Sequence, residues 1–180
     1  MLQVMPAVAI LVADQYQDQE VWYPYYRLVE AGRRVVIIGP ERKTYASKHG
    51  YPVTADLAVA QANADDYDGV IIPGGFAPDF MRREPLMAQF VREAHARAAV
   101  IAAICHGPWL LCSANVLRGK TATCFFAIKD DMVNAGARYV DREVVRDGNL
   151  ITARQPSDLP AFMKSFLEAL AEKTPTPLTA

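Results

Sequence analysis

The stretch VIAAICHGPWLL, residues 100–111, joins two apolar segments at a cysteine and a histidine. Residues 99–104 are continuously apolar, which is typical of a strand buried on both faces of a sheet. Gly107 and Pro108 interrupt this segment, and residues 107–115 then carry apolar side chains at helical spacing. We therefore predict a strand, a sharp turn at Cys105 and a helix, which together form one unit of an α/β sheet.

The same pattern recurs along the chain. Short apolar segments predict further buried strands at residues 7–13, 34–38 and 69–73, with helices at residues 21–32 and 84–97. The C-terminal part predicts a helix at 129–136, short strands near 137–140, 143–146 and 150–153, and a last helix at 158–171. Residues 39–53, rich in Gly, Pro and charge, are predicted to be a loop. This alternation predicts the α/β class, with a parallel sheet covered by helices on both faces.

Composition limits the classes of function. The 180 residues suit one domain spanning 1–180, with a core at about 7–171 and a short frayed C-terminal tail. Nineteen Lys and Arg balance twenty Asp and Glu, which argues against a nucleic-acid or anionic membrane partner. No apolar run is long enough to span a membrane, and the N-terminus lacks the basic region of a signal peptide.

Cysteine and histidine usage points to an intracellular protein without a metal. The chain has three cysteines at spacings that indicate no disulfide framework: Cys105, Cys112 and Cys124. The three histidines are scattered, so we expect no metal site and no other cofactor. We expect a cytoplasmic protein.

Unusual residues follow three of the predicted strands. Residues 14–20 (DQYQDQE), 73–79 (PGGFAPD) and 105–107 (CHG) each come directly after an apolar strand. Functional sites of open α/β sheets form just beyond the carboxyl ends of the strands. All three segments are therefore expected at one edge of the sheet.

Cys105 is the candidate nucleophile. A sharp strand-to-helix turn lifts a side chain out of the sheet, as in a nucleophile elbow. The N-terminus of the following helix is expected to lower the thiol pKa and to favour the thiolate. The alternative is a small buried hydrophobic residue, which is our interpretation of Cys112 and Cys124.

Three neighbouring features complete the candidate site. His106 is a candidate base, although adjacent side chains diverge, and it is otherwise a capping or surface residue. The backbone N–H groups of Gly74, Gly75 and His106 are candidate donors to an oxyanion, although a Gly-Gly pair is often only a turn. Glu20 either contacts the thiol as an acid or base or interacts only with the helix dipole.

These motifs together resemble the ThiJ/PfpI superfamily. AICHGPWLL, VIIPGGFAPD, SKHGY, the first loop and AIKDDMVNAG carry the resemblance, which covers roughly residues 7–170. The most similar branch is that of PfpI, described as intracellular cysteine peptidases and related to a protein deglycase. The resemblance implies a flavodoxin-like α/β three-layer sandwich with a mostly parallel central sheet.

The resemblance also implies roles for individual residues. Cys105 would be the nucleophile, Glu20 a protonated carboxyl at its sulfur, and Gly75 and His106 the oxyanion-hole amides. Asp79 would orient His106 from a neighbouring subunit, so the protein would be a homodimer or a larger homo-oligomer, with a hexamer as one possibility.

Substrate choice is less defined. Gln15 and Gln17 stand where the family often has acids, Phe125 where some members have tyrosine, and Trp109 where glutamine is usual. We expect Gly74, Phe76, Trp109 and Phe125 to line the substrate pocket, and the three aromatic residues to favour a small one.

The leading hypothesis is a cysteine-dependent hydrolase with a role in stress protection. Its substrate would be a methylglyoxal adduct, for a deglycase or glyoxalase, or a peptide, for a protease. The alternative is a non-enzymatic redox-sensing or chaperone-like protein that uses oxidation of Cys105. A glutamine amidotransferase is excluded, since that chemistry needs a histidine well downstream of the cysteine and none follows His106.

Overall fold

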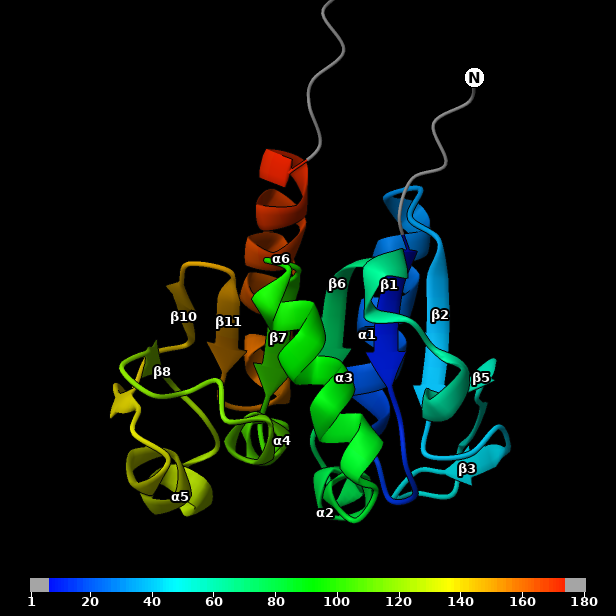
Figure 1. Ribbon diagram of the computed structural model, residues 1–180, viewed down its shortest axis with the longest axis horizontal. Helices are drawn as coiled ribbons and strands as arrows, with labels where there is room; N and C mark the ends of the chain where they lie inside the picture. Colours follow the sequence, from blue (N-terminus) through cyan, green and yellow to red (C-terminus); the bar gives the residue numbers. More distant parts are fainter. Residues whose placement is uncertain (1–6, 174–180) are drawn as a thin grey trace, which may run out of the picture.

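A seven-stranded sheet forms the centre of the computed structural model, which describes residues 7–173 (Figure 1). The strands lie in the order β10-β11-β7-β6-β1-β2-β5, and every neighbouring pair is parallel except β10–β11. Their bounds are β1 Ala7–Leu11, β2 Val35–Gly39, β5 Leu57–Ala58, β6 Tyr67–Ile72, β7 Val100–Ile104, β10 Val144–Asp147 and β11 Leu150–Ala153. The central order β2-β1-β6-β7-β11 is that of the flavodoxin-like fold.

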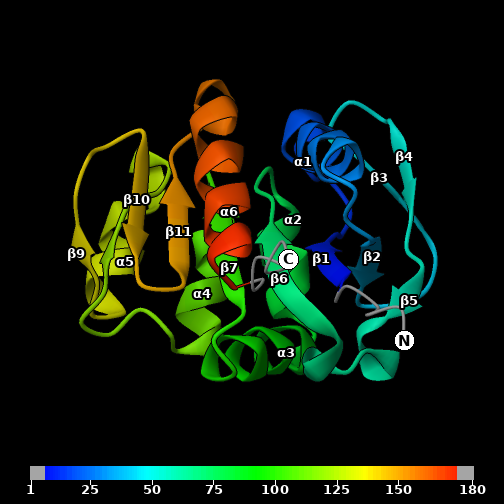
Figure 2. The ribbon, with the colours of Figure 1, turned by 90° about the horizontal axis from the view of Figure 1, so that it is seen from above.

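Helices cover both faces of this sheet, giving three layers (Figure 2). α1 (Asp18–Glu30) and α6 (Leu159–Lys173) lie side by side on one face, and α3 (Pro85–Ala96) and α4 (Pro108–Ala114) cover the other. Every residue of β1 and β7 is buried because both faces are covered. The predicted α/β class and mostly parallel sheet are confirmed.

Several short elements were not predicted. Residues 39–53, expected to be a loop, contain β3 (Thr44–Ala46), which pairs with β4 (Pro52–Thr54) as an antiparallel hairpin. Helix α2 (Ala77–Arg82) and strand β8 (Thr121–Ala122) were also missed. β8 pairs with β9 (Arg138–Tyr139) in a small ribbon beside α5 (Lys129–Asn134). Such short segments carry too few residues for a hydrophobic period, so tertiary contacts determine their conformation.

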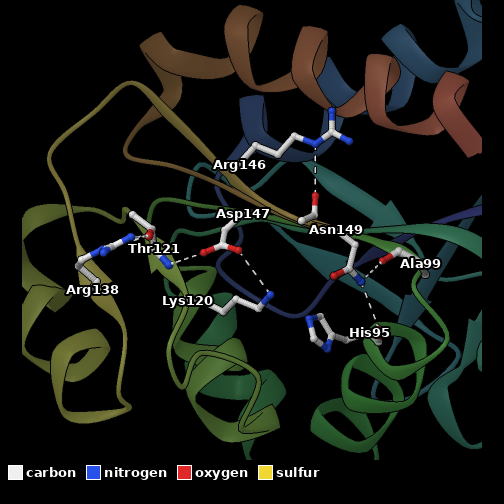
Figure 3. A network of polar contacts seen from close by, with 9 residues as sticks. His95, Ala99, Lys120, Thr121, Arg138, Arg146, Asp147 and Asn149 are labelled. Carbon is white, nitrogen blue, oxygen red and sulfur yellow. Dashed lines mark hydrogen bonds and ion pairs between the residues drawn. The ribbon is translucent and has the colours of Figure 1, made fainter.

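Polar contacts connect the chain at the amino end of β7, away from the candidate site (Figure 3). The side chain of Asn149 donates to the carbonyl oxygens of His95 and Ala99, at 3.2 and 2.8 Å. Asp147 accepts the backbone N–H of Thr121 at 2.8 Å. These contacts link the β10–β11 hairpin to the start of β7 and to the β8–β9 ribbon.

One hydrophobic cluster extends from Ala7 to Leu170 and fills the space between the layers. Within residues 7–173 no helix is both long and apolar enough to cross a membrane. The same residues contain no group of three or more His, Cys, Asp or Glu side chains placed to hold a metal ion. The predicted C-terminal tail lies outside the described residues.

Candidate active site

The carboxyl ends of β1, β6 and β7 bring the three predicted segments together. Phe76 donates its backbone N–H to the carbonyl of Gln15 at 2.9 Å, and Tyr16 forms a β-bridge with Gly75. The backbone N–H of Gly74 donates to Glu20 Oε2 at 2.6 Å. The loop after β6 is thereby held between the loop after β1 and the cysteine turn.

Cys105 occupies the sharp turn that the sequence predicts between β7 and α4. Its φ angle of +61° lies in the left-handed region, which a non-glycine residue adopts only where the surroundings enforce it. Its N–H donates to Ala153 O at 3.1 Å, and its carbonyl accepts the N–H of Phe125 at 3.0 Å. These bonds, from β11 and from the segment after β8, hold the strained turn in place. In this position Cys105 is 9% exposed.

His106 contacts the thiol directly. Its Nδ1 lies 3.3 Å from Cys105 Sγ, although adjacent side chains were expected to diverge. Two aromatic rings hold the imidazole: Phe125 stacks on it at a centroid distance of 5.0 Å, and Trp109 meets it edge-on at 5.2 Å. The left-handed conformation of Cys105 and these rings together turn the imidazole back toward the sulfur.

Glu20 is fully buried beside the thiol. It lies in the first turn of α1, and its side chain points inward to the carboxyl edge of the sheet, where Oε2 accepts the N–H of Gly74. Oε1 is buried without a conventional hydrogen-bond partner, and the thiol of Cys105 is the neighbour that interacts with this carboxyl. The Glu20 side chain therefore contacts the thiol, as one of the two sequence-based alternatives required.

Burial changes the protonation of the pair. It raises the pKa of Glu20 to about 8, despite the opposing Gly74 and Cys105 hydrogen bonds and the charge of Lys48. Burial and then the charge of Glu20 raise the pKa of Cys105 to about 12, while the N–H groups of Gly75 and His106 act in the opposite direction. The expected lowering of this pKa by the helix N-terminus is therefore not found, because burial and the charge of Glu20 raise it.

The two groups titrate together. At neutral pH Glu20 carries its proton, and the repulsion that raises the Cys105 pKa is then absent. A protonated carboxyl can donate to the thiolate, as the two backbone N–H groups do. Burial, followed by the charge of Lys48, lowers the pKa of His106, so the imidazole is neutral and able to accept the thiol proton.

The tight turn after β6 requires its glycines. A Cβ added to Gly74 would lie 2.8 Å from Cys105 Cβ, from Glu20 Oε2 and from the backbone nitrogen of His106. Gly75 has a φ of +70°, and a Cβ there would lie 2.5 Å from Gln15 O. Gly74 therefore packs tightly against both the carboxyl and the cysteine turn, and Gly75 directs its N–H to the sulfur.

Replacing Gly74 by alanine tests this close packing. We expect Gly74→Ala to lower the free energy of unfolding by about 1–3 kcal/mol, as overpacking does, and to slow alkylation of Cys105 by iodoacetamide. Gly32→Ala is the control for a glycine without close neighbours: its φ of +69° makes alanine costly there, but its Cβ position is open and lies outside the site. Denaturant unfolding and alkylation rates would be measured on both variants, and an alkylation rate of Gly74→Ala equal to that of Gly32→Ala would contradict the packing argument.

The other predicted residues make contacts with groups other than the sulfur. Asp79 forms an ion pair with Arg83 and does not contact His106 within the chain. Phe76 is 47% exposed and meets Phe80 edge-on. Trp109 donates its indole N–H to Asp131 Oδ2 at 2.8 Å, so this side chain is fixed beside His106.

Sequence analysis missed a polar link beside Glu20. Asp18 accepts the Ser47 hydroxyl at 2.6 Å, and its other oxygen lies 2.6 Å from Nδ1 of His49. Lys48, between them in sequence, lies close enough for its charge to lower the pKa values of both Glu20 and His106. The SKHGY segment contains these residues, but only the unpredicted β3–β4 hairpin brings them to the site.

A thiol on a strained strand-to-helix turn, with a paired imidazole and a buried carboxyl, defines an α/β protein of the cysteine-elbow class. Residues 6–169 match the model of the DJ-1/PfpI family, and the chain belongs to this family.

Known relatives are similar over nearly all of the chain. A deglycase of Pyrococcus abyssi is 44% identical over 163 residues, which are 91% of this chain and 98% of the relative. The putative cysteine protease YraA of Bacillus subtilis is 40% identical, covering 91% and 97%. Drosophila melanogaster DJ-1beta superposes with a TM-score of 0.86 at 31% identity, covering 94% of this chain and 92% of that chain.

Proposed function

We propose that the protein is a cysteine-dependent hydrolase that removes methylglyoxal adducts from amines and thiols. The observation that carries this proposal is Cys105 Sγ at 3.3 Å from His106 Nδ1, beside the buried carboxyl of Glu20. Relatives named as deglycases support the substrate class. The proposed role is stress protection in the cytoplasm.

In the proposed reaction Cys105 is the nucleophile. His106 takes the thiol proton, and the sulfur forms a bond to a carbonyl carbon whose electron pair moves to oxygen. The N–H groups of Gly75 and His106, which already point to the sulfur, stabilise this oxyanion. The amine leaves with the proton from His106, and water then hydrolyses the thioester to a carboxylic acid.

For an aminocarbinol of methylglyoxal, two protons move first: the C–H proton of the carbon bearing nitrogen passes to the neighbouring carbonyl carbon, and the hydroxyl proton passes to the oxygen of that neighbour. The carbonyl then lies on the carbon bearing nitrogen. Glu20, with its pKa raised to about 8, is the proposed carrier of the C–H proton. Adduct plus water equals free amine plus a 2-hydroxy acid, so the reaction needs no oxidant, reductant or cofactor.

Asp79 completes this proposal only in a homo-oligomer. Within one chain it pairs with Arg83, so a role in orienting His106 requires the Asp79 of another subunit. Phe125 and Trp109 already hold the imidazole by ring contacts. In this proposal they shape a small pocket beside the sulfur.

Peptide hydrolysis is the second candidate, supported by the relative named a putative cysteine protease. The same thiol, imidazole and amides would attack a peptide carbonyl. The 9% exposure of Cys105 favours small adducts over an extended peptide backbone. A redox-sensing role would use Cys105 and Glu20 without His106.

A panel of substrates tests the proposal. Methylglyoxal consumption, release of N-acetyl-arginine from its methylglyoxal adduct and cleavage of a fluorogenic peptide would be measured in parallel. The enzyme carries Cys112→Ala and Cys124→Ala, so that iodoacetamide reacts with Cys105 alone. We expect adduct turnover that alkylation abolishes, and no peptide cleavage.

The other outcomes are equally clear. Peptide cleavage without adduct turnover would replace the deglycase proposal by the protease one. If the enzyme turns over none of the substrates even before alkylation, the hydrolase proposal is wrong and the redox-sensing role of the thiol remains.

A further inference from the structure

Among residues 7–173, the imidazole of His106 has one hydrogen-bond partner, the sulfur of Cys105 at 3.3 Å. In enzymes that pair a nucleophile with a histidine, a third polar group usually bonds the other ring nitrogen and orients the base. The Asp79 of another subunit is the proposed source of such a group. Within one chain, the orientation of the imidazole depends on the aromatic rings that pack against it.

Two rings contact the imidazole, and they are held in different ways. Phe125 stacks on it at a centroid distance of 5.0 Å, and the backbone N–H of Phe125 donates to the carbonyl of Cys105. The position of this ring therefore follows the cysteine turn. Trp109 meets the imidazole edge-on at 5.2 Å, and its indole is held by contacts of its own side chain. Trp109 is thus the ring whose position depends on a side chain outside the site.

Two groups from neighbouring helices fix this indole. Its N–H donates to Oδ2 of Asp131, in the first turn of α5, at 2.8 Å. A hydrogen bond to a carboxylate is among the stronger kinds in proteins. The guanidinium of Arg82 in α2 lies over the ring at 5.9 Å, and its Nε donates to Ser113 Oγ at 2.8 Å. The indole therefore connects α4, which carries it, with α2 and α5.

The side chain of Asp131 does not hold α5 in place. It is exposed, whereas the next residue, Met132, is fully buried and anchors the helix, which packs against α4 (Figure 1). The backbone carbonyl of Asp131 accepts the N–H of Ala135 at 2.9 Å, a bond that any residue at position 131 would keep. Replacing the carboxylate therefore releases the indole and leaves the helix packed.

From these contacts we infer that Asp131 is a positioning residue, which holds His106 against Cys105 through the indole of Trp109. Without the Asp131 bond the indole is free to leave this position, and the imidazole loses one of its two walls. A smaller fraction of molecules then has Nδ1 at the thiol, which slows proton transfer. The inference rests on the proposed function through the role of His106 as the base.

Alkylation of Cys105 by iodoacetamide measures this transfer without a substrate. Mass spectrometry of the peptide that contains Cys105 would follow the rate with the other cysteines in place. Asp131→Ala should slow alkylation at pH 7 about 3- to 30-fold, less than the roughly 100-fold that a 1 Å misplacement can cost. Asp131→Asn keeps an acceptor for the indole N–H and should restore most of the rate. Asp130→Ala, which removes the neighbouring exposed acid from the same helical turn, is the matched control and should react like the wild type.

A double-mutant cycle tests whether Asp131 acts through the indole. Trp109→Phe removes the indole N–H and keeps an aromatic ring beside His106, and it should also slow alkylation. Adding Asp131→Ala to Trp109→Phe should then slow alkylation no further, because the bond between the two side chains is already absent. Effects that multiply would show that Asp131 acts by another route and would overturn the inference.

The indole N–H signals in an NMR spectrum report the bond itself. The chain has two tryptophans, and Trp109→Phe assigns their signals. Asp131→Ala should shift the Trp109 signal and speed its exchange with solvent. The indole N–H of Trp22, which donates to the hydroxyl of Tyr16 at 3.2 Å, is the internal control and should not change. An unchanged Trp109 signal would contradict the bond to Asp131.

Turnover of the methylglyoxal adduct of N-acetyl-arginine gives a separate measurement. Asp131→Ala should lower kcat and leave KM close to that of the wild type, because the inferred role lies in proton transfer and not in substrate binding. Wild-type alkylation in Asp131→Ala, or Asp131→Asn as slow as Asp131→Ala, would overturn the inference. If alkylation changes as expected but no adduct is turned over by the wild type, the proposed function fails while the positioning role of Asp131 stands.

Discussion

Cys105→Ala is expected to lower kcat/KM for methylglyoxal adducts by about 10⁴-fold or more, as loss of a nucleophile does. The reason is that the other groups at the site act through the sulfur. His106 contacts it at 3.3 Å, and the N–H groups of Gly75 and His106 point to it. Without a sulfur these groups have no covalent intermediate to form or stabilise.

A matched variant separates this effect from damage to the fold. Cys112→Ala removes a thiol from α4, the helix that follows Cys105, and should keep wild-type turnover. Denaturant unfolding of both variants should stay close to that of the wild type. If Cys105→Ala retains most of the wild-type turnover, Cys105 is not the nucleophile and the proposed function is wrong.

The long buried strands and helices could be predicted from the sequence because each has its own periodicity. β1 and β7 are uninterrupted apolar segments, and α3 carries apolar residues at helical spacing. The β3–β4 hairpin shows no such signal. It is held by contacts distant in sequence, such as the backbone bond from Lys48 to Tyr16 and the side-chain bond from Ser47 to Asp18.

The site could be predicted as a location but not as an electrostatic environment. Placing Cys105, Glu20 and Gly74 at one edge required only the rule that sites follow the carboxyl ends of strands. Whether the pKa of Cys105 is raised or lowered depends on how deeply the sulfur is buried and on the position of the Glu20 carboxyl.

Glu20 should make the stability of the protein depend on pH. Folding raises the pKa of this carboxyl from 4.5 to about 8, chiefly through burial. The folded state therefore binds more protons than the unfolded chain between these values, so the free energy of unfolding falls as pH rises. A full proton of difference contributes about 1.4 kcal/mol for each pH unit.

Glu20→Gln isolates this contribution. Glutamine keeps an acceptor for the N–H of Gly74 and stays neutral, so its unfolding free energy lacks the decrease that Glu20 causes. The partly buried His95 and His106, whose pKa values are lowered, have the opposite pH dependence, but they contribute equally to both proteins and cancel in the difference. Cys105, raised from 9.0 to about 12, contributes only above this window.

Guanidinium unfolding at pH 5, 6, 7 and 8 would measure the difference. We expect the variant to gain stability relative to the wild type with each step, and parallel curves would mean that Glu20 is not a buried acid. Turnover of the same variant separates the two chemical roles of this carboxyl. Glutamine still donates a hydrogen bond to the thiolate but transfers no proton, so loss of turnover with alkylation unchanged assigns the proton-transfer step to Glu20.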